Sequence, residues 1–441
     1  MGQQSVEFID GTEQNNPVLH KLRISLATMA SFDKRVQSLR QRFEQDSQPL
    51  SKFTLGATNR DGVLQQHPFV ISVFALANST RPGSFHYANT FGDEVDKPYG
   101  TNSVYWLASA TKFITTIAVM QCVEKGQLDL NGDIAKVLPE FKDPQILTGF
   151  DEKNEAIFKP STKPVTLRHL LTHSSGIAYV FMDPLLTRYQ ELHKTPTFAN
   201  RTIAEKFPHQ FLVFEPGERW VYSPGLDWAG LAVERVTSMK LGEYMQRYIF
   251  DVVSVKDATF HPELREDLQA RKARNWEREG QSLREQTKPV YAENTLDDFG
   301  GGGLFATVND LLKIYQGVLT AKLLRPETTK EMFQPHLENN RGLDKPGEYS
   351  SPSRNAIWNT VPDDVPVNFG IGGLINTAAV PKRRGVNSLT WSGHANCYWW
   401  IDLNNGVAGV YLSQLLPTGD EKAIKLLTEF EEFVYSSLDK S

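Results

Sequence analysis

Strand-like segments lie towards both ends of this sequence, and the region between them has mainly helical and loop patterns. Near the amino end, Phe69–Ala77 and Ser84–Phe91 are β-like runs joined by a Pro-Gly turn, which predicts a hairpin. The last hundred residues hold further strand-like runs at Asn368–Ile375, Ser388–Trp391, Cys397–Asp402 and Val407–Leu412, followed by a helix over Ala423–Val434. Because no repeat or low-complexity linker separates the ends, we predict one mixed α/β unit assembled from both, with a helical region inserted.

The predicted boundaries follow from this order. Residues 1–20 are a polar arm, residues 33–46 a surface helix, and residues 21–441 a single folded unit. Its α/β part comes from about 21–125 and 300–441, and its helical part spans about 126–299. Apolar residues from Ala110 to Val123 predict an amphipathic or buried helix that ends near Gly126. Thr307 and Asp310 form a capping-box pattern that opens a later helix.

Composition excludes several classes of protein. The 441 residues carry 47 Lys and Arg against 52 Asp and Glu, a net charge of −5, which argues against nucleic-acid or anionic-membrane binding. No signal sequence is visible, and no apolar run approaches the 20 or so residues that a membrane span needs. We therefore expect a soluble, cytoplasmic protein. The two cysteines, Cys122 and Cys397, fit a reducing compartment, although one disulfide between them remains an alternative.

The pattern Ser-x-x-Lys occurs three times, and one copy stands out. Ser437–Lys440 is at the carboxyl end, and Ser31–Lys34 precedes a charged helix. Ser109–Lys112 alone lies between an apolar strand-like run and a buried helix. There Lys112 reaches the serine across one helical turn, and the helix amino terminus favours developing negative charge. The alternative is that Ser109 only caps the helix.

Three motifs in order resemble a known superfamily. They are Leu107-Ala-Ser109-Ala-Thr-Lys112, Val123-Glu-Lys-Gly126-Gln-Leu128-Asp-Leu130 and Val165-Thr-Leu-Arg-His-Leu-Leu-Thr-His173-Ser-Ser-Gly176. This set resembles the serine β-lactamase-like superfamily of class C β-lactamases, penicillin-binding proteins and family VIII esterases. Within it, the segments from Leu170 to Leu186 and from Leu226 to Gly230 are most similar to fungal acyltransferases of the lovastatin side-chain type. The resemblance runs from about residue 68 to the carboxyl end and implies an α+β β-lactamase/transpeptidase-like fold, with an antiparallel sheet flanked by helices.

The resemblance also implies site residues. Trp220-Val-Tyr222-Ser-Pro224 matches the context of the family's second motif, in which a tyrosine relays a proton to and from the serine. Pro224 stands where β-lactamases have an asparagine, so that role does not transfer. Trp391-Ser-Gly393-His394 occupies the place of the Lys-Thr-Gly strand, and Trp391 replaces the lysine that grips a β-lactam carboxylate.

We accordingly expect the backbone N–H groups of Ser109 and His394 to form an oxyanion hole. Glycine at 393 would let the substrate backbone approach closely, and the His394 side chain is a candidate contact for the acceptor. Trp391 and Tyr179 belong to a crowd of aromatic residues in these segments that predicts a pocket for a large apolar group.

Other chemistry-bearing residues have simpler interpretations. His169 and His173 have an i, i+4 metal-ligand spacing but no adjacent acid, so we predict a structural turn and no metal. Asp297, Asp298 and the charged run at 263–279 are expected to be solvated surface. The glycines at 300–303 are expected to let a loop pack near the cleft.

The function predicted from these motifs is that of a serine hydrolase or acyltransferase acting through an acyl-enzyme. Ser109, activated by Lys112 and Tyr222, would attack an ester or thioester of a bulky apolar secondary metabolite, and water or an alcohol would accept the acyl group. The chemistry needs no cofactor, and the partners are small molecules. Two alternatives remain: a β-lactamase or D-amino-acid peptidase, and a catalytically inactive or repurposed protein of the same fold.

Overall fold

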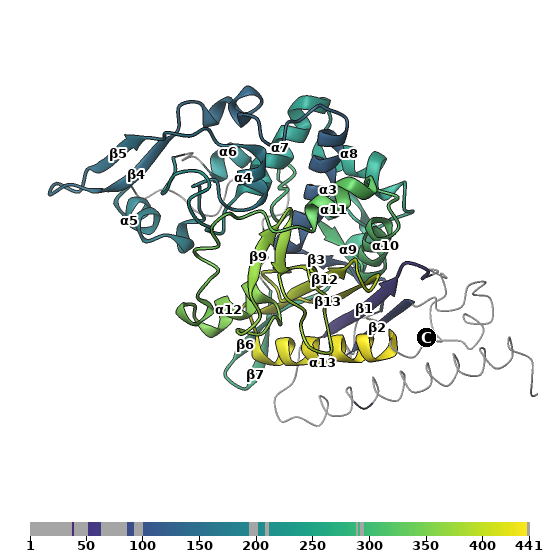
Figure 1. Cartoon of the computed structure of the whole chain (residues 1–441). Helices are drawn as coiled ribbons and strands as arrows, with labels where there is room; N and C mark the ends of the chain where they lie inside the picture. Colours follow the sequence, from purple (N-terminus) through teal and green to yellow (C-terminus); the bar gives the residue numbers. More distant parts are fainter. Residues whose placement is uncertain are drawn as a thin grey trace, which may run out of the picture.

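The structure is a computed structural model that describes residue 38 and residues 52–62, 86–91, 100–193, 202–207, 211–287, 290–291 and 295–438 (Figure 1). The predicted polar arm and the strand-like run Phe69–Ala77 lie outside these residues, as does almost all of the predicted helix at 33–46. None of the helices in the described part is long and apolar enough to cross a bilayer.

The largest sheet has seven strands in the order β2-β1-β13-β12-β11-β10-β9, and each neighbouring pair is antiparallel. The strands are β1 (Phe53–Asn59), β2 (His86–Phe91), β9 (Val367–Gly370), β10 (Gly373–Asn376), β11 (Leu389–Gly393), β12 (Cys397–Asp402) and β13 (Val407–Ser413). Strand β1 from the amino-terminal part pairs with β13 from the carboxyl-terminal part. This confirms the predicted antiparallel sheet assembled from both parts of the chain.

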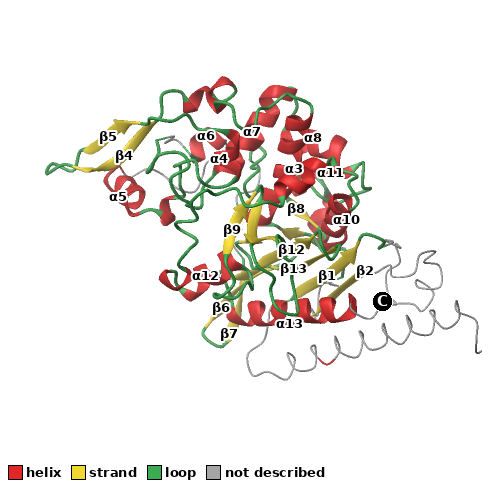
Figure 2. Ribbon diagram, viewed as in Figure 1, coloured by secondary structure: helices red, strands yellow, loops and turns green. Residues whose placement is uncertain are grey.

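Helices cover both faces of this sheet (Figure 2). The last helix, α13 (Glu421–Leu438), packs on one face, and α3 (Thr111–Glu124) and α10 (Val308–Leu319) pack on the other. Alternation along β12 shows the division, because Trp399 contacts Phe113 of α3 while Trp400 contacts Phe430 of α13. The predicted α+β architecture is confirmed.

The remaining elements form the region between the two parts of the sheet and its surroundings. The helices are α4 (Leu167–Leu171), α5 (Pro184–His193), α6 (Ile203–Lys206), α7 (Gly225–Thr237), α8 (Leu241–Met245), α9 (Glu266–Arg271), α11 (Pro326–Met332) and α12 (Ser351–Trp358). The smaller strands are β3 (Tyr105–Trp106), β4 (Gln145–Phe150), β5 (Ala156–Pro160), β6 (Asn275–Glu279), β7 (Ser282–Gln286), β8 (Phe305–Ala306) and β14 (Leu415–Leu416). The β4–β5 and β6–β7 hairpins were not predicted, since the sequence was interpreted there as helix and loop.

Two strand predictions need correction. Strand β2 forms as expected, but its described partner is β1, which the sequence pattern did not predict. The run Asn368–Ile375 was predicted as one strand and is instead a hairpin of β9 and β10. The chain reverses at Gly372, whose φ of +100° suits only glycine. The two cysteines are free and buried, so they form no disulfide.

Candidate active site

Ser109 lies in a turn that its neighbours hold rigidly. Strand β3 leads into a single 3₁₀ turn, Ala108–Ala110, and α3 follows at once. Ala108 has a φ of +45°, a strained conformation for a residue with a side chain. From Ser103 to Cys122 every residue is buried except Ser109, which is partly exposed. The turn therefore presents one hydroxyl to the surface of a buried segment.

Lys112 lies one helical turn further on, and its side chain is 1% exposed. Its Nζ donates to Ser109 Oγ at 3.1 Å, to the carbonyl oxygen of Gly301 at 2.6 Å and to the phenol oxygen of Tyr179 at 3.2 Å. An ammonium has three N–H donors, so all three have acceptors here. The N-cap residue of α3 is Ala110, which makes no side-chain cap bond. Ser109 is thus not the N-cap of α3.

Two tyrosines complete the contacts around the serine and the lysine. Tyr222, three residues before the start of α7, donates from its phenol to Ser109 Oγ at 2.5 Å. The Tyr179 amide donates to the Tyr222 carbonyl at 3.1 Å, which fixes the two tyrosines side by side. Burial raises the pKa of Tyr179 well above its usual range, and the charges of Asp227 and Tyr222 raise it further. Tyr179 therefore remains a neutral phenol.

The glycine loop, residues 300–303, is hydrogen-bonded to α3. Besides the Lys112 contact to Gly301, Thr115 Oγ1 donates to the Gly300 carbonyl at 2.7 Å. The Gly301 N–H donates to Asp227 Oδ1 at 2.9 Å. Asp227 is buried, and this desolvation raises its pKa although Lys112 and Lys206 act to lower it. The glycine loop therefore packs against α3 beside Lys112.

Trp391 is 3% exposed, and it lies behind Tyr222 with ring centres 5.2 Å apart. His173 packs edge-on against Tyr222 at 4.9 Å, and burial lowers its pKa well below the usual range. The His173 ring is therefore neutral, and its Nδ1 accepts from the Ser223 amide at 3.2 Å. His169 Nδ1 accepts from the Thr166 amide in a capping box. Both histidines thus stabilise the turn.

Gly393 of strand β11 lies directly against the turn that carries Ser109. A Cβ at this position would be 2.1 Å from the carbonyl oxygen of Leu107. Glycine is needed there because the protein's own backbone approaches it closely. His394 follows with an exposed side chain, and its Nδ1 contacts Thr418 Oγ1 at 2.7 Å.

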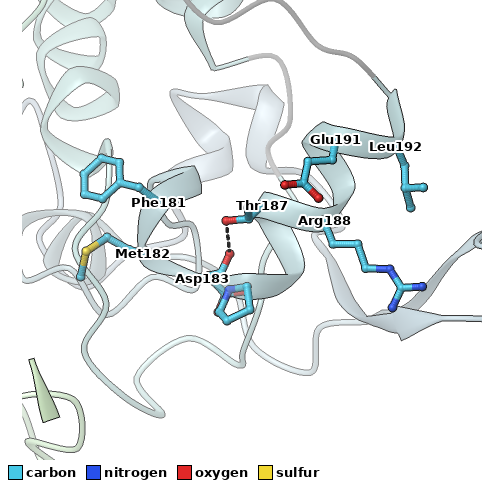
Figure 3. Close-up of a pocket in the computed structure, with 8 residues that line it drawn as sticks. Phe181, Met182, Asp183, Thr187, Arg188, Glu191 and Leu192 are labelled. Atoms are coloured by element: carbon cyan, nitrogen blue, oxygen red, sulfur yellow. Dashed lines mark hydrogen bonds between the residues drawn. The ribbon is translucent and has the colours of Figure 1, made fainter.

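Beside the site lies an open hollow of about 720 Å³ (Figure 3). It is lined by Phe181, Met182, Asp183, Pro184, Thr187, Arg188, Glu191 and Leu192. Phe181 is 74% exposed and stacks on Tyr179 with ring centres 5.5 Å apart. The hollow therefore adjoins the tyrosine pair but does not contain Ser109, Lys112 or Tyr222.

The structure brings Ser109, Lys112, Tyr222 and Tyr179 into direct contact. Trp391 packs against Tyr222, and Gly393 lies against the carbonyl oxygen of Leu107. Sequence reasoning missed Asp227, whose signal is an acid in the apolar first turns of α7. It was wrong about Asp298, which is buried and accepts from the Gly242 amide at 2.7 Å. Part of the charged run at 263–279 is not solvated surface either, since it forms half-buried strand β6 beside β14.

The fold is that of the β-lactamase/transpeptidase class. The chain belongs to the Beta-lactamase family, whose family model matches residues 73–430. It is 36% identical over 364 residues to the lovastatin esterase of Penicillium rubens, and the aligned region covers 80% of this chain and 91% of the esterase. It is 33% identical over 381 residues to the monacolin J acid methylbutanoyltransferase of Aspergillus terreus, covering 80% and 89% of the two chains.

A solved structure shows the same similarity. A mutant of simvastatin synthase from Aspergillus terreus superposes with a TM-score of 0.77 at 30% identity, covering 91% of this chain and 94% of the synthase. These comparisons confirm the predicted superfamily and the predicted enzyme class, an esterase or acyltransferase on a β-lactamase fold. They also support small-molecule acyl donors and acceptors as partners.

Proposed function

We propose that Ser109 is the nucleophile of an acyl-enzyme reaction on an ester or thioester of a bulky apolar secondary metabolite. The observation that carries the proposal is that a partly exposed serine oxygen contacts both a buried lysine and a tyrosine phenol, at 3.1 and 2.5 Å. A serine hydroxyl becomes a useful nucleophile only when such neighbours take its proton and stabilise the charge that forms.

In the acylation step, Tyr222 acts as a proton relay: its phenol oxygen takes the proton of Ser109 while Oγ forms a bond to the acyl carbon, and its own phenol proton is the one released to the leaving atom. The ammonium of Lys112 lies 4.9 Å from the Tyr222 ring centre and offsets the negative charge. The electron pair of the carbonyl double bond moves to the carbonyl oxygen. The N–H groups of Ser109 and His394 donate hydrogen bonds to the oxyanion that forms. The bond to the leaving alcohol or thiol then breaks, and the Tyr222 proton passes to the leaving atom.

Deacylation runs the same steps with a different nucleophile. Water releases an acid and makes the protein an esterase, whereas an alcohol accepts the acyl group and makes it a transferase. The relatives include both outcomes, one named as an esterase and one as a methylbutanoyltransferase. A thioester donor fits the scheme equally well, because a thiol is a better leaving group than an alcohol. The domain boundaries and the cytoplasmic location stay predictions of the sequence.

Labelling with a fluorophosphonate, followed by peptide mass spectrometry, tests the proposal. We expect one adduct on the peptide that contains Ser109, and none in the Ser109→Ala variant. An intact enzyme that gives no adduct would favour an inactive or repurposed protein.

Substrate class is tested by comparing a short-chain nitrophenyl ester with a chromogenic cephalosporin. Because Trp391 carries no charge to hold a β-lactam carboxylate, we expect ester hydrolysis to dominate. Efficient cephalosporin cleavage with negligible esterase activity would instead establish the β-lactamase alternative.

A further inference from the structure

Lys206, the last residue of α6, holds its ammonium against three aromatic rings. Its Nζ lies 4.4 Å from the ring centre of Phe299, 5.6 Å from that of Phe207 and 5.8 Å from that of Tyr291. The side chain is exposed to solvent. Within the described part of the chain it has no ion pair and no hydrogen bond from Nζ, and its neighbours there are rings.

These rings connect Lys206 to both sides of the catalytic centre. On one side the ring centres of Phe207 and Tyr179 are 6.1 Å apart, and Tyr179 accepts a hydrogen bond from Lys112. On the other side Tyr291 stacks on Trp106 with ring centres 5.1 Å apart, and Trp106 Nε1 donates to the Gly302 carbonyl at 2.7 Å.

Partial burial against these rings lowers the pKa of Lys206, and the charge of Lys112 lowers it further, while the charge of Asp227 acts against the shift. The ring contacts on its two sides place the ammonium of Lys206 beside the site that contains Ser109.

We propose that Lys206 binds a carboxylate group of the substrate, next to an apolar part of the same molecule. An unpaired, partly desolvated ammonium attracts an anion more strongly than a solvated one does. One ammonium is suited to a single negative charge, and the surrounding rings are suited to the hydrocarbon beside it. A relative that transfers an acyl group to monacolin J acid is named for an acceptor with such an acid group. The inference rests on the proposed function only in taking the ligand to be the substrate of Ser109.

The kinetic test uses matched esters. Mono-4-nitrophenyl esters of succinic, adipic and suberic acid carry a free carboxylate at three different distances from the ester carbonyl. In the corresponding methyl esters this carboxylate is blocked. For the length that shows the strongest preference, we expect Lys206→Met to lower the ratio of kcat/KM between acid and methyl ester about tenfold. Lys206→Arg should keep the preference, because it keeps the charge.

Lys125→Met is the matched control. Lys125 also lies over an aromatic ring, 4.0 Å from the centre of Tyr248, but at the end of α3 away from the serine. We expect its substitution to leave the ratio unchanged. Equal losses for acid and methyl ester in Lys206→Met would overturn the proposal and leave Lys206 a structural residue.

Calorimetric titration of the Ser109→Ala protein with monomethyl suberate separates this inference from the proposed function, because binding needs no turnover. We expect binding that Lys206→Met weakens about tenfold. Binding that does not depend on Lys206 would overturn the inference, whether or not Ser109 forms an acyl-enzyme. Stronger competition by inorganic phosphate than by monomethyl suberate would also overturn it, since Lys206 would then prefer another anion.

Discussion

Lys112 and Asp227 hold the two polar groups of a single residue, Gly301. Lys112 Nζ donates to its carbonyl oxygen at 2.6 Å, and Asp227 Oδ1 accepts from its N–H at 2.9 Å. A Cβ on this residue would lie 2.2 Å from Asp227 Oδ2, so the arrangement requires glycine. Asp227 therefore acts on the lysine beside Ser109 through a backbone position, without itself making a hydrogen bond to the serine.

Asp227→Asn separates activity from stability. Burial raises the pKa of Asp227, although Lys112 and Lys206 act against the rise. An acid with a higher pKa in the folded than in the unfolded state loses stability as the pH rises through these values, so ionised Asp227 costs stability at neutral pH. We expect the variant to keep or gain up to about 1 kcal/mol in the free energy of unfolding.

Its activity should nevertheless fall about tenfold, because Gly301 is held less firmly and the buried charge of Lys112 loses a nearby countercharge. Urea denaturation at neutral pH and kcat/KM with a nitrophenyl ester measure the two effects. A less stable variant with full activity would contradict this reasoning.

Tyr222→Phe and Tyr179→Phe distinguish the two phenols. Tyr222 contacts the serine oxygen, whereas Tyr179 contacts only the lysine. Removing a group that transfers a proton in the reaction typically costs 10²- to 10⁴-fold, so we expect a loss of about 10³-fold in kcat for Tyr222→Phe. Tyr179→Phe should lose about tenfold, since it removes one of three acceptors of Lys112. Comparable losses in both variants would show that the two tyrosines share the proton transfer.

The sequence predicted those parts of the fold that depend on local pattern. The helix from Ala110, the strands from Ser388 onward and the contact of Ser109 with Lys112 follow from hydrophobic periodicity and spacing within a few residues. Strand β1 was missed because only its pairing with β13, some 350 residues later, identifies it as part of the sheet. Asp227 and Lys206 were missed for the same reason, since their surroundings come from segments distant in sequence.

Gly393→Ala is expected to move β11 away from the nucleophile. The added Cβ would meet the carbonyl oxygen of Leu107 at 2.1 Å, and a backbone atom cannot turn aside. Overpacking of this kind costs about 1–3 kcal/mol of stability, and a shift here would also displace the N–H of His394 from the proposed oxyanion hole.

Thermal unfolding and kcat measure the effect of Gly393→Ala. Gly347→Ala is the matched control, because a Cβ there would meet nothing within 4 Å. If Gly393→Ala unfolded like the parent protein and kept its kcat, β11 would not set the geometry of the site.

His261 should make stability depend on pH through the segment that leads to the glycine loop. Its Nε2 contacts Asp298 and its Nδ1 contacts Glu263, each at 2.9 Å, and Asp298 is two residues before Gly300. Although desolvation acts to lower it, Glu263 and Asp298 raise the pKa of His261 above its ordinary value of 6.5. The resulting stability is fully present below that ordinary value and is lost as the pH rises through the raised one.

His261→Gln should therefore be less stable than the parent by about 1 kcal/mol at about pH 5.5, and the difference should shrink towards about pH 8.5. Urea denaturation across this range measures it, with His193→Gln as a control, because the exposed ring of His193 hydrogen-bonds to a carbonyl oxygen in its own helix. A difference between His261→Gln and the parent that stays constant with pH would mean that the contacts of His261 stabilise the loop without depending on its charge.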